Sequence, residues 1–191
     1  MVLRVFHGET VGEWIGTLEH RGFWIGIMAM MLVVAGSNLA VQYPINDWLT
    51  WGSFTYPVAF LVTDLTNRGL GPSVARRVVY VGFVLGVVLS LYVATWRIAL
   101  ASGGAFLIAQ LLDVHIFDRL RSGFWWRAPF VSSTLASAVD TLLFFSLAFA
   151  GTDLPWVTWG LGDYGAKIAM ALALLIPYRA LMSRVGSLNR D

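Results

Sequence analysis

The sequence lacks cysteine altogether. This absence excludes disulfide bonds, thiolate metal sites, cysteine nucleophiles and iron–sulfur ligation. Charge is scarce as well, because only 13% of the 191 residues are charged, against about 25% in soluble domains. Hydrophobic residues make up 58% of the chain, which is more than a soluble core of this size can bury. We therefore expect lipid to surround most of the chain.

Signatures of several other protein classes are missing too. The net charge is only +2, and the sequence has no basic run of the kind that binds nucleic acid. It has no Walker-type glycine loop, so it carries no nucleotide-driven motor of its own. It also lacks the HExxH pair of metallopeptidases and the clustered acidic motif of metal-dependent phosphotransferases. We expect neither enzyme activity nor a bound cofactor or metal.

Long apolar runs predict an all-α, polytopic membrane protein. A helix of about 20 apolar residues crosses a bilayer, and backbone groups in lipid must bond within the segment. We treat residues 1–191 as one transmembrane domain, in which the polar segment 1–22 is cytoplasmic rather than a cleavable signal peptide. Six transmembrane helices are expected, at about residues 23–41, 54–66, 78–95, 98–117, 128–150 and 160–182.

Arginine residues alternate between the loops that join these spans. The second and fourth loops hold three each, whereas the first and fifth hold none. The positive-inside rule then places both termini in the cytoplasm. The second span is short and contains Pro57, which favours a broken helix of the kind that transporters place at a binding site.

Polar residues in and next to the expected spans indicate an internal repeat. Asn38 and Gln42 share one face near the end of the first span, and Gln110 and Asp113 share one face of the fourth, about 72 residues later. Three spans in each half would make the second half an inverted copy of the first, as in many secondary transporters. A 3+3 inverted repeat is therefore a possible organisation of the six spans.

Ionisable residues inside a span are costly and commonly functional, and four stand out: Asp64, Asp113, Asp140 and Lys167. Asp140 ranks first among them. It lies thirteen residues after Arg127, or roughly 20 Å into the membrane at about 1.5 Å per residue. Its spacing from Ser133, Ser137 and Phe144 puts all four on one helical face. The alternative is a structural hydrogen bond between helices.

Lys167 has two candidate partners. Counting residues from the outer surface places it at a depth similar to that of Asp140, so the two side chains could meet. Asp163 lies four residues earlier and offers a local ion pair, with the lysine amine reaching outward.

The two remaining carboxylates also have local alternatives. Asp113 could pair with an arginine at the end of its helix, either Arg119 or Arg121. Asp64 could pair with Arg68, four residues further along the same helix.

Ordered motifs across most of the chain resemble the queuosine precursor transporter family, which is also labelled a vitamin uptake transporter family. The resemblance extends over roughly Ser37–Arg184. Tyr56 departs from the family pattern, where phenylalanine is commoner before the proline, and Asn67–Gly69 falls in a loop that varies. The motifs are RIALAS (97–102), AQLLDVHIFDRLR (109–121), WWRAP (125–129), AVDTLLFF (138–145) and DYGAK (163–167), with SN (37–38), Gln42, GSFTYP (52–57) and TDL (63–65) upstream.

The resemblance implies a bacterial inner-membrane importer of 7-cyano-7-deazaguanine (preQ0), with the aminomethyl form (preQ1) as a second candidate, for salvage of the tRNA nucleoside queuosine. Asp140 or Asp113 would accept the two adjacent donors of the deazaguanine, in a site that also holds Asp64. Other side chains would meet the carbonyl or nitrile, or stack on the ring. These are Gln110, Asn38, Gln42 and Lys167 for the first role, and Phe54, Tyr56 and Phe144 for the second.

Rival functions stay open at this point. A substrate-binding subunit that needs a separate energising module has a similar size and span count. An integral membrane enzyme or a purely structural subunit is also conceivable, although a structural subunit would not need three buried carboxylates. We expect a small-molecule substrate, contact with lipid, a homodimer and no nucleic acid.

Overall fold

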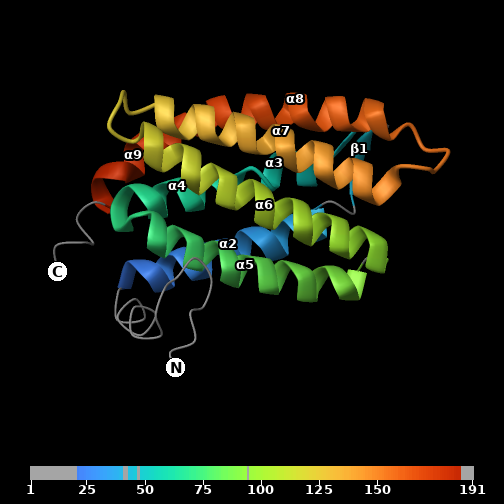
Figure 1. Cartoon of the computed structure of the whole chain (residues 1–191), viewed down its shortest axis with the longest axis horizontal. Coiled ribbons are helices and arrows are strands. Elements are labelled where there is room, and N and C mark those ends of the chain that lie inside the picture. The colour runs from blue at the N-terminus through green and yellow to red at the C-terminus, as the bar shows by residue number, and fades with distance from the viewer. Residues whose placement is uncertain (1–20, 41–42, 47, 94, 186–191) are drawn as a thin grey trace.

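The computed structural model describes residues 21–40, 43–46, 48–93 and 95–185. Helices dominate this part of the chain, which confirms the all-α class (Figure 1). The elements, in chain order, are α2 (Arg21–Ala40), β1 (Pro44–Asn46), β2 (Leu49–Thr50), α3 (Gly52–Thr55), α4 (Val58–Leu70), α5 (Pro72–Val93), α6 (Trp96–Leu120), α7 (Arg127–Phe149), α8 (Trp156–Ala173) and α9 (Leu175–Val185).

Three single helices, α5, α6 and α7, are long and apolar enough to cross a membrane. Helices α8 and α9 reach that length together, as one span bent by 44°. Helix α2 is apolar over a shorter stretch, Arg21–Ser37, and α4 has 13 residues. The chain is therefore a multi-pass membrane protein, while the count of six spans and the inverted repeat stay predictions.

The long helices run back and forth between two ends of one bundle (Figure 1). The α4–α5 and α6–α7 connections, where arginine is concentrated, lie at the same end as the start of α2 and the end of α9. The α5–α6 and α7–α8 connections and the β1–β2 hairpin lie at the opposite end. This is the separation that the loop charges predict, although which end faces the cytoplasm stays a prediction.

Helices α3 and α4 together form the broken helix that Pro57 predicted. Tyr56 and Pro57 separate the two helices, and Pro57 begins α4 as its N-cap. Proline suits this position because the first turn of a helix has no intrahelical use for its missing N–H. Gly71 ends α4 with a φ of 89°, a conformation that glycine adopts without steric cost.

Helix α4 extends further than the sequence suggested. The prediction that Asn67–Gly69 form a loop is wrong, because these residues make the last turn of α4. The Asn67 side-chain amide donates a 3.0 Å hydrogen bond to the backbone carbonyl of Val114 on α6. This bond ties the end of α4 into the bundle.

The last span is bent rather than continuous. Leu174 separates α8 from α9, and Pro177 follows as the third residue of α9. A proline there cannot donate a hydrogen bond to the Ala173 carbonyl four residues earlier, and its ring crowds that carbonyl. The bend brings α9 against α4.

A short antiparallel hairpin, β1–β2, occupies the connection that we expected to be a plain loop. The Asn46 side-chain oxygen accepts hydrogen bonds from the backbone N–H groups of Trp48 and Leu49, at 2.9 and 3.0 Å. The hairpin packs against α8 at Gly162, where an added Cβ would lie 3.2 Å from the Trp48 carbonyl oxygen. Glycine at this position allows the close approach.

The surface and interior have the distribution expected for a protein in lipid. Large apolar side chains are exposed along several helices, for example Leu32 at 70%, Leu142 at 66% and Leu161 at 69%. The interior combines an apolar core between α2, α4, α5 and α6 with many buried polar side chains on α4, α6, α7 and α8. Polar and ionisable groups in a membrane protein face the bundle interior because exposing them to lipid is costly.

Candidate functional site

Lys167 is the centre of a buried ionic cluster between α7 and α8. Its Nζ lies 2.7 Å from Asp140 Oδ2 and 2.6 Å from Asp163 Oδ2. It also donates a 3.1 Å hydrogen bond to Thr141 Oγ1, and that hydroxyl donates to Asp163 Oδ2 at 2.9 Å. The prediction that Asp140 meets Lys167 is confirmed. The local pair with Asp163 forms as well, but the lysine side chain is only 5% exposed and does not reach outward.

Local spacing explains how the chain builds this cluster. Asp140 and Thr141 are neighbours on α7, and Asp163 lies one turn before Lys167 on α8, so the packing of α7 against α8 brings all four side chains together. Two carboxylates and one ammonium give the cluster a formal charge of −1. Buried ions are tolerated when they are paired and hydrogen-bonded, and each of these three ions is.

Asp64 and Asp113 form a second polar group, between α4 and α6. Asp64 is 2% exposed and accepts hydrogen bonds from Ser132 and Ser133 of α7, at 3.5 and 3.3 Å. Asp113 is fully buried and close enough to Asp64 for their side chains to interact. Neither Asp113 oxygen accepts a hydrogen bond from a donor among the described residues.

The local ion pairs that we considered for these two carboxylates do not form. Arg68 donates to the backbone carbonyl of Arg121, and Arg121 donates back to the carbonyl of Arg68. Arg121 also forms a 3.2 Å ion pair with Asp118 at the surface. The arginines thus join the ends of α4 and α6 to each other and leave the buried carboxylates without a cation in contact.

Gln110 continues the polar face of α6 one turn before Asp113. Its Oε1 accepts a 2.6 Å hydrogen bond from Thr63 Oγ1 of α4. Its Nε2 is buried and has no acceptor among the described residues. The interface between α4 and α6 therefore contains a spare donor and spare acceptors within one helical turn.

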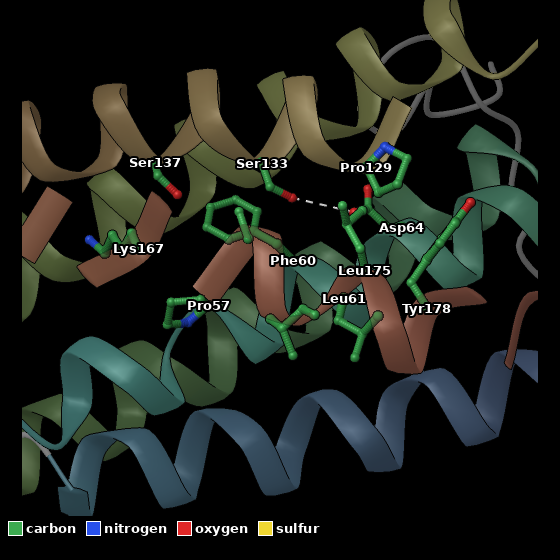
Figure 2. A pocket seen from close by; sticks show the side chains of 12 residues that line it. Pro57, Phe60, Leu61, Asp64, Pro129, Ser133, Ser137, Lys167, Leu175 and Tyr178 are labelled. Atoms are coloured by element: carbon green, nitrogen blue, oxygen red, sulfur yellow. Dashed lines mark hydrogen bonds between the residues drawn. The ribbon is translucent and has the colours of Figure 1, made fainter. Parts of the chain in front are cut away.

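A cavity of about 310 Å³, its open side included, lies between α4, α7, α8 and α9. The enclosed part of this space is far smaller than a small-molecule pocket of about 300–1,000 Å³, so a nucleobase-sized ligand would enter only if the surrounding side chains move. Figure 2 shows Lys167 towards one end of the cavity and Asp64 towards the other, with the Phe60 ring between them. Ser133 and Ser137 of α7 add hydroxyl groups to the wall.

The predicted site residues divide into several groups around this cavity. Asp64 and Lys167 line it. Asp140, which contacts Lys167, does not line it, nor do Asp113, which interacts with Asp64, and Gln110, whose partner is Thr63. The side chain of Asn38 and the whole of Gln42 fall outside the described residues.

The predicted aromatic residues do not line the cavity. Tyr56 packs edge-on against Phe106, with ring centroids 6.0 Å apart, and interacts with Ser102 and the ionic cluster. Phe144 packs against Phe145 and Phe149, and Phe54 is half-buried on α3. The stacking role predicted for these rings has no support from the cavity wall.

Two aromatic residues of the cavity, Phe60 and Tyr178, are missing from the predicted site. Phe60 lies four residues before Asp64, on the same face of α4, and this spacing was a usable signal. Tyr178 reaches the cavity only because α9 bends back towards α4, and the sequence pattern does not show that geometry. Among the described residues, no group of three His, Cys, Asp or Glu side chains is arranged to hold a metal ion.

Comparison with known proteins assigns the chain to a transporter family. The family model described as "Putative vitamin uptake transporter" matches residues 50–95 and 89–182, which include the ionic cluster and the cavity. The chain is 34% identical over 184 residues to the queuosine precursor transporter of Escherichia coli (strain K12), covering 81% of this chain and 83% of that protein.

Two further relatives carry similar names. The "Probable queuosine precursor transporter" of Haemophilus influenzae is 33% identical over 188 residues, with 77% of this chain and 80% of that protein covered. The "Probable queuosine precursor transporter" of Bacillus subtilis (strain 168) is 28% identical over 202 residues, with 84% and 85% covered. No solved structure matches the chain.

Proposed function

The chain belongs to the vitamin uptake transporter family, and from this premise we propose that it imports a queuosine precursor, 7-cyano-7-deazaguanine (preQ0), across the bacterial inner membrane. The names of the relatives support the precursor as substrate. The single observation that carries the proposal is the cavity with a carboxylate towards one end and an ammonium towards the other. Salvage of the imported base for tRNA queuosine follows as the physiological role.

The ends of the cavity match opposite sides of the ligand. In preQ0 the ring N–H and exocyclic amine form one donor edge, and the nitrile acceptor lies on the other side of the fused rings. Asp64 would accept the donor edge, because an ionised carboxylate accepts two parallel hydrogen bonds. Lys167 would donate to the nitrile, and Phe60 between them would stack on the flat face of the base.

This assignment changes the role of Asp140 from reader of the ligand to positioning residue. Asp140 ranked first by sequence, yet its Oδ2 holds Lys167 and its side chain does not line the cavity. It would orient the lysine towards the ligand. Asp64 reaches the cavity wall and accepts only long hydrogen bonds, at 3.3 and 3.5 Å, so it is the better acceptor for incoming donors.

Calorimetry with preQ0 on purified variants tests the assignment. Asp64→Asn keeps the side-chain shape but adds donors that would face those of the ligand. Losing a charge-assisted hydrogen bond costs about 1.5–3 kcal/mol, or about 10- to 150-fold in affinity. Asp118→Asn, at the surface, is the matched control and should bind as the parent does. Parent-like binding by Asp64→Asn, or no binding by the parent chain, would contradict the proposal.

The placement of Lys167 at the nitrile also predicts a preference between the two precursors. The aminomethyl group of preQ1 is an ammonium at neutral pH and would face the Lys167 ammonium. Like charges placed together cost several kcal/mol in a recognition site. We therefore expect preQ1 to bind more weakly than preQ0 in the same calorimeter, and tighter binding of preQ1 would overturn the placement of Lys167 at the nitrile.

Two further expectations belong to the same proposal. The purified chain alone should take up preQ0 into liposomes, which distinguishes an importer from a binding subunit that needs an energising module. We also keep the homodimer as a prediction, to be tested by mass measurement of the detergent-solubilised protein. Both termini are expected in the cytoplasm.

A further inference from the structure

The Asp64–Asp113 pair contains more negative charge than its surroundings balance. Both side chains are buried, at 2% and 0% exposure, and they interact with each other. Like charges repel, and an ionised carboxylate only accepts hydrogen bonds, so neither side chain can stabilise the other while both are ionised. Two adjacent carboxylates in a low-dielectric site do not both ionise. In this closed geometry, where water reaches neither side chain, one proton on the pair is therefore favoured.

The donors of α7 do not satisfy both groups. Ser132 and Ser133 each have one hydroxyl proton, and each donates it to Asp64. Both oxygens of Asp113 are left without a donor although the residue is fully buried. The buried Nε2 of Gln110 lies one turn away on the same helix and has no acceptor. These are the features of a site that binds one more small polar species, and a proton on Asp113 is the smallest.

Among the described residues, no cation forms an ion pair with Asp64 or Asp113. Tyr178 of α9 faces Asp64 and interacts with it. Lys167 of α8 is held by its own two carboxylates, towards the other end of the cavity. The remaining ionisable residues on or beside the packed elements are Arg21 on α2; Tyr56 between α3 and α4; Arg68 on α4; Arg76, Arg77, Tyr80 and Tyr92 on α5; Arg97, His115, Asp118 and Arg119 on α6, with Arg121 at its end; Arg127 and Asp140 on α7; Asp163 and Tyr164 on α8; and Arg179 and Arg184 on α9.

We propose that Asp113 carries one proton inward with each ligand molecule, so that the chain is a proton symporter whose coupling site adjoins its recognition site. The inference rests on the proposed function, because Asp64 serves both sites. In the open state, water reaches Asp64 through the cavity and lets both carboxylates ionise. A bound base covers Asp64 and excludes that water, so only one of the two carboxyl groups can stay ionised.

The proton therefore loads together with the ligand. A proton from the outer aqueous phase binds a carboxylate oxygen of Asp113, while Asp64 stays ionised and accepts the donor edge. When the cavity opens inward the base leaves, water returns, and Asp113 releases the proton into the cytoplasm. No bond in the ligand changes, and the outside-acid proton gradient supplies the driving force.

Reconstituted proteoliposomes separate this coupling from binding. With an acidic exterior, the parent should concentrate radiolabelled preQ0 inside the vesicles. The vesicle interior should become more acidic at the same time, as reported by a trapped pH-sensitive dye. Asp113→Asn fixes the neutral form of the side chain. It should keep exchange of external for preloaded internal preQ0 but lose gradient-driven accumulation and the dye signal. Asp118→Asn, five residues further along α6 and at the surface, should behave as the parent.

Each outcome bears on the inference. Accumulation by the parent that ignores the proton gradient, or that follows a sodium gradient instead, overturns it and leaves the proposed importer standing. Retained proton-driven accumulation in Asp113→Asn overturns the role of Asp113. Loss of both exchange and accumulation in Asp113→Asn, with unchanged thermal stability, makes Asp113 a ligand-binding residue and also refutes the proposal. A parent that neither binds nor exchanges preQ0 removes the proposed function and this inference together.

Discussion

Replacing Lys167 by methionine should destabilise the protein more than neutralising either carboxylate beside it. Methionine is also a long, unbranched side chain, so the change chiefly removes the ammonium. Lys167 Nζ holds both Asp140, at 2.7 Å, and Asp163, at 2.6 Å. Without it, two buried carboxylates are left with no cation in contact. Asp140→Asn, in contrast, leaves Lys167 paired with Asp163.

The expected difference follows from the two kinds of loss. Breaking a buried ion pair by removing one partner costs about 3–5 kcal/mol, since an uncompensated buried charge is left behind. Losing one hydrogen bond to a charged group costs about 1.5–3 kcal/mol. A change of 1 kcal/mol shifts Tm by about 2–4 °C in a protein of 150–250 residues. Lys167→Met should therefore lower Tm by about 6–20 °C, and Asp140→Asn by about 3–12 °C.

Thermal unfolding in detergent, followed by tryptophan fluorescence, measures both changes. Arg119→Met, an exposed cation on α6, is the control and should shift Tm little. The double variant Lys167→Met/Asp140→Asn should be more stable than Lys167→Met alone, because only one unpaired carboxylate remains. A Lys167→Met variant as stable as the control, or a double variant less stable than Lys167→Met alone, would refute the buried cluster as the source of the effect.

Two shorter predictions test the packing and the orientation of the bundle. Gly103→Val should lower stability by about 1–3 kcal/mol in the same unfolding assay, because a Cβ there would lie 2.6 Å from Val87 Cγ2. Gly104→Val should be milder, since no neighbour lies within 4 Å of a Cβ at that position. Equal losses in the two variants would contradict the close approach of α5 to α6. Reporter fusions after Asp191 and near Asp153 should report opposite sides of the membrane; the same side for both would contradict the span map.

The sequence was informative wherever a single helix determined the answer. Apolar length predicted the helical class, Pro57 predicted the break between α3 and α4, and the cost of charge in lipid predicted that Asp64, Asp113, Asp140 and Lys167 are buried. Counting depth along the two helices and the spacing within α8 left Asp140 and Asp163 both open as partners of Lys167, and the structure contains both contacts.

Features that depend on how distant helices pack could not be predicted. For Asp64 and Asp113 we expected arginine partners within about two turns along the same helix, whereas in the structure the two carboxylates lie close to each other, across α4 and α6. The position of Tyr178 depends on the bend at Leu174. Local spacing carries no information about such contacts, since it describes one helix at a time.

The two ends of the cavity differ in how their charge is balanced, and this difference separates two tasks. At the Lys167 end an ammonium is fixed between two carboxylates, so its charge and position stay constant as a ligand arrives. A fixed donor is what specific recognition requires. At the Asp64 end both oxygens of Asp113 lack a donor among the described residues, and in the proposed cycle the combined charge of the two carboxyl groups depends on whether water or a ligand covers Asp64. A charge that changes with occupancy is what energetic coupling requires, since a proton bound equally in all states would drive nothing.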